Sequence, residues 1–530
     1  MRLLCLALLA CLAPSAIAQT WPLTRAERTD YKETSHYENV VSFLHDLQSA
    51  GAPIWVTNIG KSTEGKEIPL AIASFPRVSS AAQARRLGKP IVYIQANIHA
   101  GEVEGKEAAM IVLRRLLQEG PKGLLGKMVL LVAPIYNIDG NEKFGPVAVN
   151  RPEQDGPAMV GLRPNGQGLD LNRDAIKAES PEARGAIEDI YNTWDPDVML
   201  DLHTTDGTRH GWELTYSPPL NPNTLQSIMR LDRDQMIPFV RREIQDKYGL
   251  PLFDYGNTER RNGKVGWYTF GQEGRYWTNY VGLRNRLSVL SEATTYIPFK
   301  ARVSVTDKFV TSILQYVADH ARAVMETTRD ADAQVVQWGL NPASAPPLGV
   351  RFEFASRGEE DALLEKKALV RPDPTSRPAA IEKVRMPIYD RFKATKTAKF
   401  PSAYLIPPSE EKTVALLREH GIVVEKLLSP WKFAGEQFTI SEVKIAGRPF
   451  QGHRLMELNG SFSPVTQEAS SGAYLVRTAQ PLGLLAFHIL EPESDDGAMA
   501  WGFMGEGFSA GQVYPILKTF DPVNPATIRM

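Results

Sequence analysis

The alternation of apolar, strand-like runs with helix-like segments constrains the fold of this chain more than any other feature. Residues 91–98 (IVYIQANI) and 128–135 (MVLLVAPI) are apolar almost throughout, as expected of strands covered on both faces. Between them, residues 102–119 carry apolar positions at helical spacing and an acidic first turn. This alternation predicts an α/β layer fold with a largely parallel or mixed sheet.

The same pattern continues toward the middle of the chain. Residues 181–194 open with a proline and have the pattern of a helix, and residues 197–204 and 287–294 are further strand candidates. Together these segments predict that residues 19–335 form one α/β domain.

The composition changes after a Pro- and Ala-rich stretch at 341–348, which indicates a domain boundary. Residues 403–427 have the pattern of a small αβ unit. From residue 431 onward, short β-like runs, among them GLLAFHIL at 483–490, are separated by Gly, Pro and Ser. We expect residues 349–530 to form a smaller, β-rich accessory region with an αβ part.

The first residues have the pattern of a secretory signal peptide. Arg2 precedes an apolar run that ends at Leu12, and residues 16–18 (AIA) form a small-x-small cleavage sequence. The apolar run is too short to cross a bilayer. We therefore predict a signal peptide at 1–18, no membrane span, and export to a periplasm or to the extracellular space. A lipoprotein anchored through Cys11, within a loose lipobox, is the alternative.

Composition limits the chemistry that is available. The only two cysteines, Cys5 and Cys11, lie in the predicted signal peptide, so the mature chain would contain no disulfide, thiolate ligand or cysteine nucleophile. The 60 basic and 61 acidic residues give a formal net charge of -1, which argues against a nucleic-acid partner. Any metal site would consist of His, Asp and Glu side chains.

Two histidines and one glutamate stand at the ends of predicted strands. His99 follows the first apolar run, and Glu102, three residues later, can reach the same ion. His203 ends the strand candidate 197–204, and open α/β sheets bind ligands at such strand ends. Two His and one Glu are a ligand set of catalytic zinc, with a fourth position left for water. A histidine satisfied within the core is the alternative for His203 alone.

Three further polar segments accompany these residues. Residues 168–174 (GLDLNRD) place a carboxylate, an amide and a guanidinium within four residues of one another. Residues 136–140 (YNIDG) follow the second apolar run, where Asp139-Gly140 is typical of a structural turn. Glu292 lies near the end of the strand candidate 287–294.

In this order, H-x-x-E, an N-x-D-G turn, D-L-N-R, a strand-end His and a late strand-end Glu resemble the zinc carboxypeptidases of the M14 family. The resemblance extends over about residues 30–325 and not over the C-terminal third. It implies a mixed, mostly parallel eight-stranded sheet flanked by helices. It also implies that residues 19–335 form the catalytic domain of a zinc metallopeptidase, which hydrolyses C-terminal peptide bonds with a metal-activated water.

The resemblance implies a role for each residue near the metal. His99, Glu102 and His203 would bind one zinc ion per chain. Asp170 would accept a hydrogen bond from His99 and so fix its tautomer.

The resemblance likewise implies the residues that meet the substrate. Asn172 and Arg173 would hold the terminal carboxylate of a peptide, because a guanidinium can bond a carboxylate with two N–H groups. Glu292 would act as the general base. A structural ion pair is the alternative for Arg173, and for Glu292 the alternative is pairing with Arg284 or Arg286.

The sequence departs from the family pattern in three places, one of which is Asp174, where many relatives have Asn after the Asn-Arg pair. The family usually has an arginine that stabilises the oxyanion, within a tryptophan-led basic run upstream of D-x-N-R. Here the run AMVGLRPNGQG offers Arg163, with Arg151 as the alternative. The family often has a mobile tyrosine some twenty residues before the base, and Tyr268, Tyr276 and Tyr280 all remain open.

Two other functions fit the same residues. One is a cell-wall (murein) peptide amidase or deacylase on the same fold, and its substrate would be a peptidoglycan peptide. The other is a catalytically inactive domain that binds peptides or cell wall. A serine hydrolase is disfavoured, because no histidine follows Ser509 in the G-x-S-x-G run at 507–511. The acidic run 490–497 is interpreted as a solvated loop, with a calcium site as the alternative.

Overall fold

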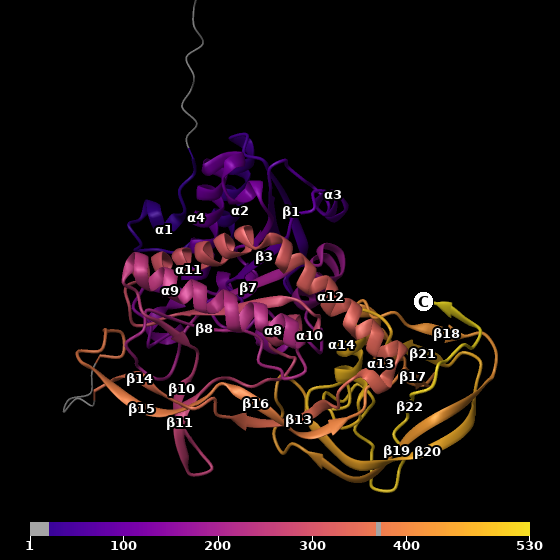
Figure 1. Ribbon diagram of the computed structural model, residues 1–530. Coiled ribbons are helices and arrows are strands. Elements are labelled where there is room, and N and C mark those ends of the chain that lie inside the picture. Colours follow the sequence, from indigo (N-terminus) through magenta and orange to yellow (C-terminus); the bar gives the residue numbers. More distant parts are fainter. Residues whose placement is uncertain (1–20, 367–372) are drawn as a thin grey trace, which may run out of the picture.

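The predicted strands assemble into one eight-stranded sheet. The computed structural model describes residues 21–366 and 373–530 (Figure 1). The strands of this sheet are β1 (Ile54–Lys61), β2 (Glu67–Ala73), β3 (Ile91–Ala96), β4 (Val129–Ala133), β7 (Val198–Thr204), β8 (Leu214–Ser217), β9 (Leu252–Asp254) and β12 (Leu287–Ala293). Their order is β1-β2-β4-β3-β7-β12-β8-β9.

The direction of the strands confirms the predicted mixed, mostly parallel sheet. β3 runs parallel to β4 and β7, and β12 runs parallel to β7. β2 and β8 run antiparallel to β4 and β12. Every residue of β3, β4, β7 and β12 is buried, which explains why these strands read as continuous apolar runs.

Helices flank the sheet. α4 packs on β3 and β7 and against α11, and α10 packs on β7 and β12. The helices of this part are α1 (Arg25–Arg28), α2 (Tyr37–Ser49), α3 (Ala81–Arg86), α4 (Glu104–Glu119), α5 (Ile138–Glu142), α6 (Val147–Asn150), α7 (Pro181–Gly185), α8 (Gln226–Leu231), α9 (Ile237–Tyr248), α10 (Trp277–Leu283), α11 (Phe299–Asp319) and α12 (Ala321–Leu340).

Shorter elements complete this part of the chain. The helix predicted at 181–194 is α7 continued by a π-helix, η4 (Ala186–Trp194). The other short elements are η1 (Gly120–Lys122), η2 (Leu124–Gly126), η3 (Leu171–Arg173), η5 (Asp232–Met236), η6 (Pro342–Ser344), β5 (Gly145–Pro146) and β6 (Met159–Val160). Of the helices in the described ranges, none combines the length and the apolar character that crossing a membrane requires.

β3 ends two residues earlier than the apolar run predicts. Asn97 adopts a φ of 63°, in the left-handed region that asparagine tolerates, and this turns the chain out of the sheet. The side-chain amide of Asn97 then donates hydrogen bonds to the carbonyls of Ala100 and Glu102, both at 3.2 Å. The turn therefore carries His99 and Glu102 beyond the strand, immediately before α4.

The C-terminal region, residues 348–530, contains a seven-stranded sheet with the order β20-β19-β22-β17-β21-β18-β23. Figure 1 shows α12 running from the first region toward α13 and α14 of the second. The elements of this region are β13 (Leu348–Ala355), β14 (Glu359–Glu365), β15 (Ile381–Tyr389), β16 (Arg391–Ala398), β17 (Ala403–Ile406), α13 (Glu411–Glu419), β18 (Glu425–Leu427), β19 (Trp431–Ile445), β20 (Met456–Ala469), β21 (Tyr474–Arg477), α14 (Gly483–Leu490), β22 (Leu517–Thr519) and β23 (Thr527–Arg529).

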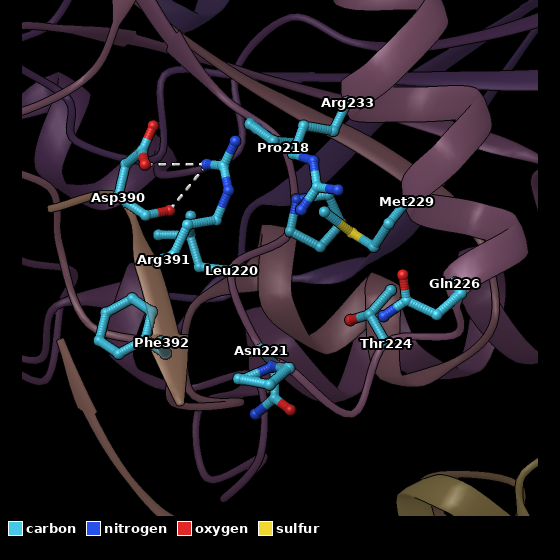
Figure 2. Close-up of a pocket in the computed structure, with 12 residues that line it drawn as sticks. Pro218, Leu220, Asn221, Thr224, Gln226, Met229, Arg233, Asp390, Arg391 and Phe392 are labelled. Carbon is cyan, nitrogen blue, oxygen red and sulfur yellow. Dashed lines mark hydrogen bonds and ion pairs between the residues drawn. The ribbon is translucent and has the colours of Figure 1, made fainter. Parts of the chain in front are cut away.

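The two regions share a third sheet. A hairpin of the first region, β10 (Asn257–Arg261) and β11 (Lys264–Tyr268), continues into β15 and β14 of the second. Trp267 on β11 and Ile388 on β15 belong to one apolar cluster. The regions also enclose a cavity of about 130 Å³ between residues 218–233 and 390–392, where Arg391 is hydrogen-bonded to Asp390 (Figure 2). The division of the chain into a domain of residues 19–335 and an accessory region of residues 349–530 stays a prediction.

Two predictions for the C-terminal region are wrong. The run GLLAFHIL is the helix α14, not a strand, and all eight of its residues are buried. An apolar run of this length that is buried on every side has no periodicity to separate helix from strand. The acidic run 490–497 is not a solvated loop, because Glu491 pairs with Lys518 at 2.9 Å and Asp496 pairs with Arg275 at 2.7 Å in the interior.

Candidate active site

Three side chains converge where β3 and β7 end. His99 and Glu102 come from the turn before α4, and His203 is the sixth residue of β7. The Nδ1 atoms of His99 and His203 are 3.2 Å apart. The Glu102 carboxylate reaches both, with 3.0 Å from Oε1 to His99 Nδ1 and 3.0 Å from Oε2 to His203 Nδ1. Among the described residues, this is the one group of His, Cys, Asp and Glu close enough to share an ion.

The other nitrogen of each imidazole faces a carboxylate. His99 Nε2 lies 3.0 Å from Asp170 Oδ1, and His203 Nε2 lies 3.0 Å from Asp201 Oδ2. These carboxylates favour a proton on Nε2 and so leave the Nδ1 lone pairs aimed at the centre. Two lone pairs and a carboxylate at such distances repel one another unless a cation lies between them. The donor set therefore fits a metal ion of the kind that His and Glu ligands bind.

The electrostatics of these groups also favour a bound cation. Burial alone would lower the pKa of His203, but Asp201 and Glu102 raise it well above its ordinary value. Burial alone would raise the pKa of Glu102, but His99 and Arg151 hold it well below its ordinary value. The site thus combines an ionised Glu102 with carboxylates around His203 that favour a positive charge there.

Arg151 holds Glu102 from behind. Its Nη1 donates to Glu102 Oε1 at 3.1 Å, and its Nη2 donates to the carbonyls of Thr204 and Thr205. The amide of Thr204 donates to Glu102 Oε2 at 3.1 Å. Because these bonds occupy a buried side chain, Arg151 holds Glu102 in place.

Arg163 lies on the open side of the same group. Two of its nitrogens bond Asp170 Oδ2, Nη2 at 2.8 Å and Nε at 3.1 Å, and its Nη1 lies 3.5 Å from Glu102 Oε1. The side chain of Arg163 is 37% exposed and that of Arg151 only 8%. Of the two arginines considered from the sequence, Arg163 is therefore the one that a substrate can reach.

One cavity of about 70 Å³ brings most of the predicted site residues together. His203 and Asp170 support this cavity from behind without lining it. The residues that line it are His99, Glu102, Arg163, Asn172, Arg173, Thr204, Asp206, Tyr255, Phe270, Tyr276, Leu290 and Glu292.

Glu292 occupies the register position beside His203, because β12 and β7 are parallel neighbours. Burial raises the pKa of Glu292 well above its ordinary value, and the negative charges of Glu102 and Asp206 add to this, while His203 opposes it. Within the described part of the chain, its Oε2 makes no hydrogen bond. Pairing with Arg284 or Arg286 is excluded, since these arginines bond other groups. The carboxylate is thus available to a molecule in the cavity.

Asn172 and Arg173 follow Asp170 in the short helix η3. The side chain of Asp170 caps this turn by accepting from the amide of Asn172 at 2.9 Å. The guanidinium of Arg173 lies 4.4 Å from the ring centre of Tyr276 and donates to the carbonyl of Asn172 at 2.7 Å. Its nearest carboxylate oxygen in an ion pair is at 3.9 Å, on Asp170. Arg173 therefore stands at the cavity with donors left for an anionic ligand.

Of the three tyrosines left open by the sequence, Tyr276 lines the cavity. Tyr268 stacks on Tyr389 in the shared sheet, with ring centres 4.3 Å apart. The hydroxyl of Tyr280 is 2.8 Å from His420 Nδ1 in the interior.

Sequence reasoning missed several residues of the cavity wall, among them Asp206, Tyr255 and Phe270. Tyr255, Phe270 and Tyr276 form a row of rings, with centres 5.9 Å and 4.9 Å apart, and Tyr255 donates to Asp206 at 3.5 Å. Asp206 stands three residues after His203, so its position beyond a strand end could have singled it out. Tyr255 and Phe270 lie in loops that carry no motif, and only the fold brings them to the cavity.

Comparison with known proteins agrees with this geometry. The profile of the zinc carboxypeptidase family matches residues 40–281. A protein named carboxypeptidase 2 from Trichophyton equinum is 25% identical over 480 residues, which cover 86% of this chain and 81% of the relative. Carboxypeptidase 2 from Trichophyton rubrum is 22% identical over 479 residues, with the same coverage.

Two solved structures are also similar in part. The metallo-carboxypeptidase from Burkholderia cenocepacia is 17% identical with a TM-score of 0.40, over 54% of this chain and 70% of that one. Carboxypeptidase A from Helicoverpa armigera is 17% identical with a TM-score of 0.40, over 55% of this chain and 75% of that one.

The site and the matching profile define a metallopeptidase of the carboxypeptidase type. Residues 40–281 form a zinc carboxypeptidase domain of the M14 family. The alignment with the first fungal relative covers 86% of this chain, which is more than residues 30–325 contain. The similarity therefore extends into the C-terminal third, where the sequence motifs showed no resemblance.

Proposed function

We propose that the protein is an exported carboxypeptidase that binds one zinc ion through His99, Glu102 and His203 and releases C-terminal residues from peptides. The observation that carries this proposal is the meeting of two Nδ1 atoms and one carboxylate within 3.0–3.2 Å, with a carboxylate behind each imidazole. Such an arrangement orients both histidines for a metal and raises their basicity.

The chemistry that zinc supplies when bound is polarisation of the scissile carbonyl and a lowering of the pKa of water to about 7. Asp170, hydrogen-bonded to His99 Nε2, holds the proton on that nitrogen, and the charge of Asp201, 3.0 Å from His203 Nε2, favours a proton there. Arg151 keeps the Glu102 carboxylate in its position against the same centre.

Glu292 is the proposed general base. It lies beside His203 in the cavity, and one of its oxygens has no partner within the described residues. It would take a proton from the attacking water and later deliver this proton to the nitrogen of the departing amino acid. A cation among the neighbouring ligands would favour the ionised carboxylate that the first transfer requires.

Arg173 and Asn172 are proposed to hold the terminal carboxylate of the substrate. The ring of Tyr276 under the Arg173 guanidinium orients this fork toward the cavity. Arg163, which lines the same cavity, is proposed to stabilise the negative charge that develops on the carbonyl oxygen.

Export is proposed from the signal sequence at 1–18, which lies outside the described residues. A periplasmic or extracellular location remains part of the proposal, and so does the lipid anchor at Cys11 as its alternative.

The experiment that tests the proposal compares two peptides of one sequence, with a free and with an amidated C-terminus. Purified protein is incubated with zinc and each peptide, and the products are identified by mass spectrometry. We expect stepwise loss of C-terminal residues from the free-ended peptide alone. Internal cleavage would refute the carboxypeptidase assignment. Cleavage of neither peptide would favour the murein amidase or the inactive binding domain, which digestion of purified muropeptides would distinguish.

A further inference from the structure

The hairpin of β19 and β20 in the C-terminal region ends in a tight turn beside the active site. Phe450 and His453 close the turn through reciprocal backbone hydrogen bonds of 2.7 Å and 3.0 Å. The two residues between them, Gln451 and Gly452, both have positive φ angles, of 49° and 83°. Two-residue turns of this form favour Asn, Asp or Gly at both positions.

Gln451 is therefore an unusual residue for its backbone conformation. A glutamine in the left-handed region is strained, and such strain persists where the surroundings give the residue another use. The side chain shows this use, because its Oε1 accepts a hydrogen bond from the amide of Asp170 at 2.8 Å.

Asp170 is the residue through which several active-site groups are held. Its carboxylate bonds His99 Nε2 at 3.0 Å and Arg163 Nη2 at 2.8 Å. It also accepts from the amide of Asn172 at 2.9 Å. A displacement of Asp170 would thus reach a proposed metal ligand, the proposed oxyanion arginine and the carboxylate-binding turn together.

The rest of the turn fixes Gln451 in place. His453 Nε2 lies 2.8 Å from Glu179 Oε1 in the first region. The Phe450 ring faces the guanidinium of Arg275, at 5.3 Å. The turn therefore contacts the first region at three points, and the central one is the amide of Asp170.

We propose that Gln451 is a positioning residue of the active site, so that the C-terminal region completes the site that the eight-stranded sheet begins. This inference rests on the proposed function, since it assigns Gln451 a role toward the proposed ligand His99. Gln451 acts through Asp170 and does not itself contact the cavity.

The test replaces Gln451 by residues that suit the turn but cannot reach Asp170. Gln451→Gly removes the acceptor and relieves the backbone strain, and Gln451→Asn keeps an amide on a side chain one carbon shorter. We expect an unchanged or higher melting temperature in both. We also expect the zinc dissociation constant to rise about 10-fold and kcat/KM to fall by a similar factor. This is the low end of the roughly 10- to 100-fold loss that follows removal of a group supporting a metal ligand. Gln451→Glu, which keeps an acceptor oxygen on a side chain of the same length, should retain most of the zinc affinity and most of kcat/KM.

The matched control is Gln512→Ala. The Oε1 atom of Gln512 also accepts one backbone N–H at 2.8 Å, from Ser509, in an exposed loop of the same region. This variant should match the wild type in zinc affinity and in kinetics.

Each outcome decides one question. Wild-type zinc affinity and kinetics in Gln451→Gly and Gln451→Asn would overturn the inference while leaving the proposed function intact. Absence of zinc binding by the wild-type chain would instead refute the proposed function. Failure of both variants to fold would also overturn the inference, because a residue with a positioning role alone tolerates both turn-forming replacements.

Discussion

The eight-stranded sheet and the C-terminal region contribute to the active-site cavity in different ways. In the sheet, His203 and Glu292 occupy paired positions on parallel neighbouring strands, so the ladder itself sets their separation. Among the described residues, the C-terminal region lines none of the cavity, yet its loops bond Asp170 and Arg275. The strands thus fix His203 and Glu292 directly, whereas contacts from the C-terminal region hold loops around the cavity in place.

Individual buried carboxylates of the two regions also differ in whether a cation pairs with them. In the C-terminal region, the buried carboxylates of Glu491 and Asp496 each pair with a cation, Lys518 and Arg275. In the first region, the carboxylate of Glu292 is buried without such a pair and its pKa is raised. Paired charges are typical of structural contacts, and an unpaired carboxylate in a cavity is typical of a functional one.

The largest effect should follow loss of a proposed metal ligand from the first region. His99→Ala removes one of the two Nδ1 donors, so we expect loss of bound zinc and of detectable peptidase activity together. Metal analysis and the free-ended peptide assay check this. His45→Ala, an exposed histidine on α2, serves as the control and should retain both. Full zinc content in His99→Ala would contradict the ligand assignment.

A second variant separates metal binding from proton transfer. Glu292→Gln keeps the shape of the side chain but cannot accept a proton, so we expect normal zinc content and a fall in kcat of about 10²- to 10⁴-fold. Steady-state kinetics and metal analysis provide the measurement. Full activity in this variant would show that Glu292 is not the base.

The contact between the two regions can be broken at Asp496. Asp496→Ala leaves the guanidinium of Arg275 buried without its partner, which is expected to lower the free energy of unfolding by about 3–5 kcal/mol. Because the loop of Arg275 carries Tyr276, kcat/KM should also fall in protein that remains folded. Urea unfolding and kinetics test this, with the exposed Asp521→Ala as control. An unchanged stability would show that the C-terminal region does not hold this loop.

A smaller effect is expected at Arg173, the proposed carboxylate-binding residue. Arg173→Ala removes a charge-assisted hydrogen bond of about 1.5–3 kcal/mol, so kcat/KM for the free-ended peptide should fall about 10- to 100-fold. Arg184→Ala, an exposed arginine on α7, should behave as the wild type. Competition by the amidated peptide supplies the specific readout. If free-ended and amidated peptides bind the wild type equally well, Arg173 does not read the terminal carboxylate.

A further effect should come from pH at the boundary between the regions. His420 is buried against Tyr280, Arg284 and the carbonyl of Ile176, and burial lowers its pKa to about 3. The unfolded chain binds a proton below about pH 6.5, whereas the folded chain does so only near pH 3. The free energy of unfolding should therefore fall as the pH drops from 6.5 toward 3, by up to about 1.4 kcal/mol per unit.

Unfolding at pH 7 and pH 4.5 checks this dependence. His420→Gln should lose less stability between these two values than the wild type, and His45→Gln should not differ from it. An equal loss of stability in His420→Gln and in the wild type would show that low pH destabilises the protein by protonating other groups.

The sheet and the meeting of His99, Glu102 and His203 could be predicted because local patterns specify them. Buried parallel strands read as apolar runs, and the residues after 91–98 and 197–204 meet because parallel strands end at one edge. The order of the motifs then indicated the arrangement around Asp170 and Glu292, which the structure gathers at one cavity.

The role of the C-terminal region could not be predicted from the same patterns. Its decisive contact joins Gln451 to Asp170 across 281 positions, and no local periodicity encodes such a pairing. The acidic run 490–497 looked solvated because its cationic partners, Lys518 and Arg275, lie far from it in the sequence or in the other region. The place of Tyr255 in the cavity wall could not be predicted either, because only the fold brings its loop to the cavity.

The most direct test of the central claim is the position of the metal. A crystal of the zinc-loaded protein, measured with X-rays above and below the zinc absorption edge, locates zinc by its anomalous scattering. We expect one strong peak per chain, in contact with His99 Nδ1, His203 Nδ1 and Glu102. No peak at these three residues, or a stronger peak elsewhere in the chain, would contradict the account.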